Sequence, residues 1–146
     1  MTDTVQFNEL IEDAVGTAFD EAQFITVAYT GDDGWPQVSR RGSTHVYGPG
    51  QIAIWVRKRD DGLAKAIERD SKVTLFYIDM AKRFQLLTFY GQAHVSNDQA
   101  VSDKVWENTP EREKAQDPEH KGIPLIIDVE RVVAQGGKPE QNFVLG

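Results

Sequence analysis

The chain of 146 residues contains no cysteine. This absence excludes disulfide bonds, thiolate nucleophiles and zinc sites built on thiolates. Histidine is scarce, and His45, His94 and His120 lie far apart without HxH or HExxH spacing, so we expect no metal site. The sequence has no GxSxG, GxGxxG or Walker motif, and no serine has a recognisable base partner. The chain lacks the usual residues for unaided chemistry, and this favours a bound cofactor.

Long hydrophobic runs are also missing. The segment 1–16 contains acidic residues and no apolar core of a secretory signal. No stretch approaches the roughly 18 apolar residues of a membrane span, so we expect a soluble cytoplasmic protein. The formal net charge of −7 argues against nucleic acid or an anionic membrane as a partner, because the long-range field repels both. A local basic cluster on such a chain favours a small anionic ligand instead.

What is present is a set of short strands and helices of one α+β domain, residues 1–146. Apolar residues at helical spacing predict a helix over about 6–20. Two shorter helices are expected, one opened by Asp60-Asp61-Gly62 and one running from about 97 to 106. Gly91 is interpreted as a bulge or a point of close backbone approach. Six strands are expected, which suggest an antiparallel barrel, over 23–30, 36–47, 52–56, 73–78, 84–95 and 123–133.

Three adjacent cations stand where the apolar strand 52–56 ends and a helix is about to begin. These residues are Arg57, Lys58 and Arg59. The N-terminus of the following helix adds free N–H groups and partial positive charge, so the segment suits a phosphate group. The alternative is a solvated strand end whose cations pair with Asp60 and Asp61.

A second polar group lies inside the predicted strand 36–47. Strand alternation places Arg40 and Gly42 on one face, and Arg41, Ser43 and His45 on the other. Two arginines in a strand require solvent or an anion, because a buried unpaired charge is costly. Gly42 lacks a side chain and would let a flat ligand approach the backbone. The alternative is a solvent-facing row on an edge strand.

Tryptophan occurs at three positions, Trp35, Trp55 and Trp106. We interpret these residues most simply as core or interface residues. Any of them could also border a flat aromatic ligand.

The succession GDDGWPQVSRRGSTHVY, GPG, QIAIWVRKRDDGLAKAIERDSKVTLFYID and RFQLLTFYGQAHV resembles the pyridoxamine 5′-phosphate oxidase-like FMN-binding split barrels. It is most similar to their short members of the general-stress-protein type, and the resemblance covers about residues 20–135. It implies an α+β fold with a six-stranded antiparallel split β-barrel and peripheral helices. It also implies a homodimer with two FMN molecules, each held in a groove between subunits.

The resemblance assigns cofactor contacts to particular residues. The second strand would contact the flavin and its phosphate through Arg40, Arg41, Gly42, Ser43 and His45. The end of the third strand would lie beside the ring and the ribityl chain through Trp55, Val56 and Arg57. The following loop and helix would hold the phosphate through Lys58, Arg59 and Lys65. The partner's fifth strand would offer a polar side chain near the ring, and Gln85 is the nearest match.

An FMN-dependent oxidoreductase with a small-molecule redox partner is the expected function, with hydride carried by the flavin and no side chain assigned as catalytic. Many family members carry Lys or Arg-Lys where this chain has Asp61, Gly62 and Leu63. The C-terminus GKPEQNFVLG lacks the tryptophan, arginine and histidine of true pyridoxamine-phosphate oxidases, so we do not expect the vitamin B6 reaction. Alternatives are a deazaflavin or haem cofactor, a non-catalytic flavin-binding stress protein, and a dimeric barrel without a ligand.

Overall fold

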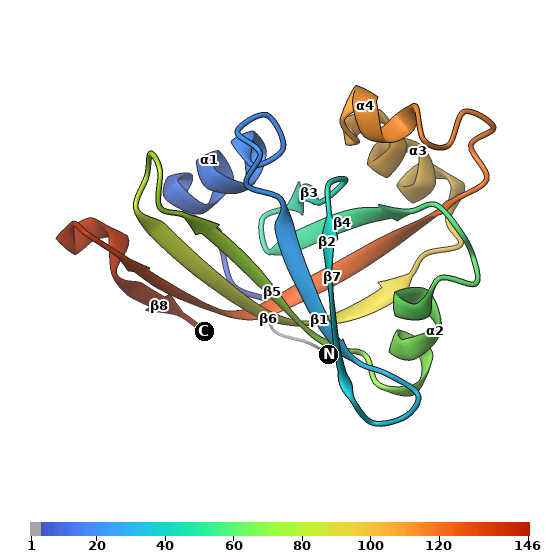
Figure 1. Cartoon of the computed structure of the whole chain (residues 1–146), viewed down its shortest axis with the longest axis horizontal. Helices are drawn as coiled ribbons and strands as arrows, with labels where there is room; N and C mark the ends of the chain where they lie inside the picture. The colour runs from blue at the N-terminus through green and yellow to red at the C-terminus, as the bar shows by residue number, and fades with distance from the viewer. Residues whose placement is uncertain (1–3) are drawn as a thin grey trace.

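A computed structural model describes residues 4–146, and it shows an α+β fold built on one antiparallel sheet (Figure 1). The strands follow the order β2-β1-β5-β6-β7-β4-β3, and β8 pairs with β7 outside this path. The two strands at the ends of the path, β2 and β3, are consecutive in the chain. The strand bounds are β1 Ile25–Thr30, β2 Pro36–Arg41, β3 His45–Gly48, β4 Gln51–Val56, β5 Lys72–Asp79, β6 Gln85–Val95, β7 Ile123–Gly136 and β8 Phe143–Leu145.

The strand count differs from the predicted six, because the described residues form eight strands. The predicted strand 36–47 is divided into β2 and β3 by a turn at 42–44, and β8 lies in the C-terminal tail, beyond the last predicted strand at 123–133. The side chain of Ser43 explains the division. Its buried Oγ accepts the Trp55 N–H at 3.0 Å and donates to the Trp55 carbonyl at 3.1 Å, so it replaces a backbone partner of β4.

The helices cover the ends and edges of the sheet (Figure 1). Their bounds are α1 Glu9–Thr17, α2 Gly62–Arg69, α3 Gln99–Asn108 and α4 Glu111–Lys114, with the short 3-10 helix η1 at Pro139–Gln141. Carboxylate or amide caps start the first three, because Asn8, Asp61 and Asp98 each accept a backbone N–H of the first turn. Among residues 4–146, no helix is both long and apolar enough to cross a membrane.

The hydrophobic core lies on the inner face of the curved sheet, where α1 contributes Ile11 and Ala14. Strand β4 is buried on both faces, as its uninterrupted apolar sequence predicts. Ile52, Ile54 and Val56 belong to the main core, whereas Ala53 and Trp55 join a second cluster with Val105 of α3. Strand β4 therefore separates the barrel interior from the layer formed by α3.

Gly91 lies at an irregularity of the β6–β7 ladder, which confirms the predicted bulge or close approach. The register shifts between Tyr90 and Gly91, so Glu130 of β7 has no paired residue on β6. A Cβ atom at position 91 would stand 2.5 Å from the carbonyl oxygen of Asp128. Only glycine allows the two backbones to approach this closely.

Candidate functional site

A cavity of about 540 Å³ opens where β2 and β4 end, between the N-terminus of α2 and the α4 segment. It gathers residues that are far apart in the chain, and it includes seven of the twelve residues predicted for the cofactor site. Those seven are Arg40, Arg41, Gly42, Ser43, Trp55, Arg57 and Lys58. The remaining lining residues are Ser39, Asp61, Glu113, Gln116 and Asp117.

Arg41 is held by a carboxylate of the protein itself. Its two terminal nitrogens donate to the two oxygens of Asp61 at 3.0 and 3.1 Å, and its Nε donates to Ser39 Oγ at 3.0 Å. Asp61 also accepts the Leu63 N–H at 2.8 Å and so caps α2. Burial raises the pKa of Asp61, but the hydrogen bonds and charge of Arg41 outweigh burial and lower it below its ordinary value. The pair fixes the end of β2 to the start of α2.

The cations of the segment 57–59 form no ion pair within 4.0 Å among the described residues, and this includes Asp60 and Asp61. Arg57 and Lys58 line the cavity, whereas Arg59 lines two other hollows, one between α2 and β6 and one at the start of α3. Arg40 also lines the cavity; its guanidinium lies over the Phe24 ring at 5.2 Å and donates to the Phe24 carbonyl at 3.5 Å. Three cations therefore border one cavity without a carboxylate within 4.0 Å in residues 4–146.

Trp55 is buried beneath the segment between α3 and β7. Its indole N–H donates to Asp117 at 2.9 Å, and its ring packs edge-on against the ring of Trp106 with the centroids 5.0 Å apart. His120 stacks on Trp106 at 4.0 Å between centroids. Trp55 is thus a core residue that also forms part of the cavity wall, while Trp35 is 71% exposed on the β1–β2 turn.

Asp117 anchors the segment that covers Trp55. Besides the indole, its carboxylate accepts the backbone N–H groups of Lys121 at 2.9 Å and Gly122 at 2.8 Å. Burial raises the pKa of Asp117, but these three hydrogen bonds outweigh it and lower the pKa below its ordinary value. The group is consequently a buried anion whose hydrogen-bonding capacity is used by the protein.

Glu113 of α4 fills the space that a side chain at position 42 would need. A Cβ atom built on Gly42 would lie 2.6 Å from Glu113 Oε1. The absence of a side chain at Gly42 therefore admits a carboxylate of the chain itself. With four cationic and three acidic side chains, the cavity lining carries one net positive charge.

The other five predicted site residues lie outside this cavity. Val56 is fully buried in the core, and Lys65 lines a hollow beside the β1–β2 turn. His45 donates from Nδ1 to the Ser43 carbonyl at 2.7 Å, and burial lowers its pKa despite that hydrogen bond. Gln85 is 1% exposed and lines a second cavity near α1, and Arg59 faces the hollows described above.

Sequence reasoning missed the acidic and polar residues supplied by Glu113, Gln116 and Asp117. These lie in the polar segment 108–122, for which the sequence predicts no helix or strand. No spacing or motif in that segment indicates that it folds back onto β4. The sequence predicts Asp60 or Asp61 as the helix cap, and Asp61 has that role, but its pairing with Arg41, twenty residues earlier, depends on the sheet topology.

No protein-family model and no curated protein matches the chain. Solved structures do match. HupZ of Group A Streptococcus has a TM-score of 0.70 at 18% identity, over 94% of this chain and 98% of that chain. A protein from Clostridium acetobutylicum is related to general stress protein 26 and belongs to the pyridoxinephosphate oxidase family. It has a TM-score of 0.67 at 13% identity, over 94% of this chain and 95% of that chain. A NimC/NimA family protein from the same organism has a TM-score of 0.67 at 15% identity, over 95% of this chain and 99% of that chain.

These structural similarities identify the fold of the chain. The chain has the fold of the pyridoxamine 5′-phosphate oxidase-like split barrels, as the resemblance of the sequence predicted. The general-stress-protein type, which the sequence resembles most, is among the matching structures.

Proposed function

We propose that this protein binds FMN in the cavity at the ends of β2 and β4 and acts as an FMN-dependent oxidoreductase. The observation that carries the proposal is the convergence of Arg40, Arg57 and Lys58 on one cavity without carboxylate partners among the described residues. A phosphate dianion would gain charge-assisted hydrogen bonds from them, each worth about 1.5–3 kcal/mol. The match of the fold to a pyridoxinephosphate oxidase family protein supports the same ligand class.

The cavity is compatible with a ligand of this kind in size and in polarity. Its 540 Å³ falls within the range of about 300–1,000 Å³ typical of small-molecule sites. The carboxylate of Glu113 would repel phosphate, so we place the phosphate at the Arg57 and Lys58 end. The hydroxyl groups of a ribityl chain can donate to Glu113, and Trp55 offers an aromatic edge nearby.

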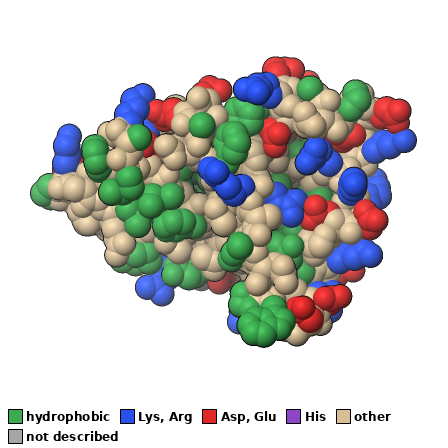
Figure 2. Space-filling view, in the orientation of Figure 1, with side chains coloured by type: hydrophobic (Ala, Val, Ile, Leu, Met, Phe, Trp, Pro, Cys, Tyr) green, Lys and Arg blue, Asp and Glu red, His purple; other side chains and the backbone are tan. Residues whose placement is uncertain are grey.

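The proposed active form is a homodimer whose subunits meet on the outer face of the sheet. Outward residues of four strands are apolar and well exposed, namely Val38 at 71%, Ile78 at 42%, Tyr90 at 41% and Val144 at 58%. In Figure 2, hydrophobic side chains gather over β5 and β6, and basic side chains lie between α2 and α4 on the same side of the molecule. A second copy covering the apolar face would remove this surface from water.

The apolar face reaches the cavity through β2. Val38 and Arg40 are two residues apart on that strand and therefore point to the same side of the sheet. A partner seated over Val38 would border the cavity that Arg40 lines. This continuity supports the expectation that FMN lies in a groove between subunits.

In this proposal the residues of the chain bind and orient the cofactor. Arg57, Lys58 and Arg40 hold the phosphate, and the Arg41–Asp61 pair keeps the end of β2 and the start of α2 at a fixed separation. When bound, FMN supplies hydride transfer to or from a small redox partner. No side chain is assigned a catalytic role.

Titration with FMN tests the proposal. We expect the double substitution Arg57→Ala with Lys58→Ala to weaken FMN binding at least tenfold, or about 1.4 kcal/mol or more, because two phosphate partners are lost. Quenching of flavin fluorescence gives the dissociation constant. Arg59→Ala is the matched control, since this neighbouring cation faces other hollows and its loss should leave binding unchanged.

Equal binding by the parent and the double variant would exclude the segment 57–58 from the site. The absorbance of the purified protein distinguishes the rival cofactors. An absorption band of flavin at about 450 nm supports the proposal, and a Soret absorption band would identify haem instead. Protein that stays colourless and binds no added FMN would indicate a barrel without this ligand.

A further inference from the structure

The carboxylates that line the proposed FMN cavity differ in whether the protein already uses them. Asp61 pairs with both terminal nitrogens of Arg41. Asp117 accepts the indole N–H of Trp55 and two backbone N–H groups. Glu113 of α4 is half-buried in the same lining and forms no ion pair within 4.0 Å in the described part of the chain. Its charge is therefore available to the hydrogen-bond donors of a ligand.

Gly42 gives the Glu113 carboxylate its place on the cavity wall. A Cβ atom at position 42 would lie 2.6 Å from Glu113 Oε1, 2.9 Å from its Cδ and 3.3 Å from the ring of Phe19. The φ angle of Gly42 is not in the left-handed region, so the backbone itself would accept a side chain here. The space left by the missing side chain is thus occupied chiefly by the carboxylate.

Two buried residues hold the segment that carries Glu113. Thr109 is buried and donates from Oγ1 to a backbone carbonyl of α3 at 2.7 Å. On the other side, the buried Asp117 accepts the indole N–H of Trp55 at 2.9 Å. Between them, the Glu113 N–H donates to the Pro110 carbonyl at 2.9 Å. The carboxylate therefore belongs to a segment that is tied to the body of the protein at both ends.

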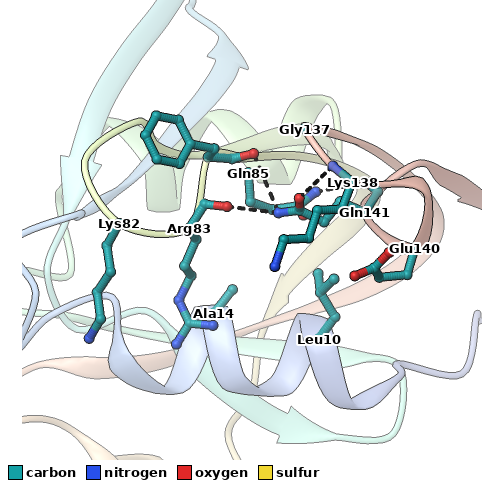
Figure 3. Close-up of a pocket in the computed structure, with 10 residues that line it drawn as sticks. Leu10, Ala14, Lys82, Arg83, Gln85, Gly137, Lys138, Glu140 and Gln141 are labelled. Atoms are coloured by element: carbon teal, nitrogen blue, oxygen red, sulfur yellow. Dashed lines mark hydrogen bonds between the residues drawn. The ribbon is translucent and has the colours of Figure 1, made fainter.

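The second cavity, near α1, does not repeat this arrangement. Its lining also contains a carboxylate and a glycine, namely Glu140 and Gly137. Figure 3 shows the Glu140 carboxylate at the edge of that cavity. A Cβ atom on Gly137 would meet nothing within 4 Å, so no carboxylate occupies the space beside it. Of these two cavities, the proposed FMN site is the one that pairs a glycine with a carboxylate.

We propose that Glu113, in the space left by Gly42, determines which flavin cofactor the cavity accepts. This inference rests on the proposed FMN function. Arg40, Arg57 and Lys58 attract the phosphate, whereas the Glu113 carboxylate repels it and accepts hydrogen bonds from the hydroxyl groups of the ribityl chain. The site therefore selects a chain that is both phosphorylated and hydroxylated, because a chain without hydroxyl groups leaves this carboxylate without donors.

An FMN analogue with an unbranched pentyl phosphate at N10 tests this selection, because it keeps the ring and the phosphate and lacks the chain hydroxyl groups. We expect the parent protein to bind FMN at least tenfold tighter than the analogue in flavin fluorescence titrations. Glu113→Ala should reduce this preference to about twofold or less, and Glu113→Gln, which keeps an acceptor, should retain part of it. Glu111→Ala is the control on the same helix, since that side chain is 90% exposed and its loss should leave the preference unchanged.

Gly42→Ala tests the pairing of the two residues. The new Cβ should displace the carboxylate and reduce the preference for FMN over the analogue severalfold. In the Glu113→Ala background the same substitution should change the preference no further, because the two changes remove one interaction. Circular dichroism establishes that each variant is folded. An equal effect of Gly42→Ala in both backgrounds would overturn the pairing, since the glycine would then contact the ligand itself.

The same titrations separate this inference from the proposed function. If the parent protein binds no FMN, the proposed function fails and the inference fails with it. If the parent binds FMN tighter than riboflavin but binds FMN and the analogue equally, selection by Glu113 is wrong while the phosphate site stands. The same conclusion applies if Glu113→Ala keeps the full preference for FMN over the analogue.

Discussion

At the scale of single residues, Ser43 shows how one side chain can complete the backbone hydrogen bonding at the end of a strand. Its hydroxyl both accepts from and donates to the backbone of Trp55, at the position where β3 has not yet begun to pair with β4. The residue is 4% exposed, so water cannot replace these hydrogen bonds. The same turn brings Gly42 and Arg41 to the cavity.

We expect Ser43→Ala to lower the free energy of unfolding by about 1–3 kcal/mol, because it leaves a buried N–H and a buried carbonyl without partners. Urea unfolding monitored by tryptophan fluorescence measures the change. Ser102→Ala on α3 is the control and should stay within about 0.5 kcal/mol of the parent. An equally small effect at position 43 would mean that the hydroxyl does not complete the ladder.

Sequence reasoning located the cations of the site but could not resolve their partners. Arg40, Arg41, Arg57 and Lys58 converge on one cavity, as a shared phosphate site requires. Their individual states differ, because Arg41 is paired with Asp61, whereas Arg40, Arg57 and Lys58 have no ion pair within the described part of the chain. That distinction depends on distances between segments that local patterns do not contain.

At the scale of elements, the Arg41–Asp61 pair links strand β2 to helix α2 and also removes one cation from the cavity. Asp61 has two functions, since it neutralises Arg41 and caps the helix. Asparagine is about as good a helix cap as aspartate but carries no charge. The substitution Asp61→Asn therefore separates the two functions.

We expect Asp61→Asn to strengthen FMN binding severalfold, by on the order of 1 kcal/mol, because Arg41 becomes available to the phosphate. The fluorescence titration described for the proposed function measures this gain. Asp60→Asn removes a neighbouring charge that forms no ion pair within 4.0 Å in residues 4–146, so it should produce a smaller change. Unchanged or weaker binding by Asp61→Asn would show that the phosphate does not reach Arg41.

Apolar patterns predicted most elements well, and the errors have a physical cause. Strand β4, helix α2 and the bulge at Gly91 follow from local sequence, because burial and backbone geometry select their residues. The break between β2 and β3 cannot be predicted in this way, since polar and β-branched residues continue through 43–46. Only the Ser43 contact with β4 ends the strand. β8 pairs with β7 over three residues, too few for a period to be visible.

At the scale of the whole molecule, the outer sheet face and the cavity belong to one proposed assembly. The registers place Phe76 of β5 beside Thr88 of β6, and Val133 of β7 beside Val144 of β8. Thr88 in turn pairs with Val133, so the row is continuous across four strands. A second copy is the occupant that the family resemblance implies.

We expect Ile78→Asp to shift the protein from dimer to monomer and to weaken FMN binding, because a charge would be buried in the interface. Ile78 is 42% exposed in the single chain, so the monomer should remain folded. Sedimentation and circular dichroism measure the two properties. Gln99→Asp, on the exposed first turn of α3, should change neither, and a dimeric Ile78→Asp variant would contradict this interface.

The central claim, that the cavity cations hold the phosphate of FMN, is tested most directly by comparing FMN with riboflavin. The two molecules share the ring and the ribityl chain and differ in the phosphate. We expect the protein to bind FMN at least tenfold tighter than riboflavin, or about 1.4 kcal/mol, with the preference lost in Arg57→Ala with Lys58→Ala and kept in Arg59→Ala. Equal affinity of the parent protein for FMN and riboflavin, or no binding of either, would contradict the account.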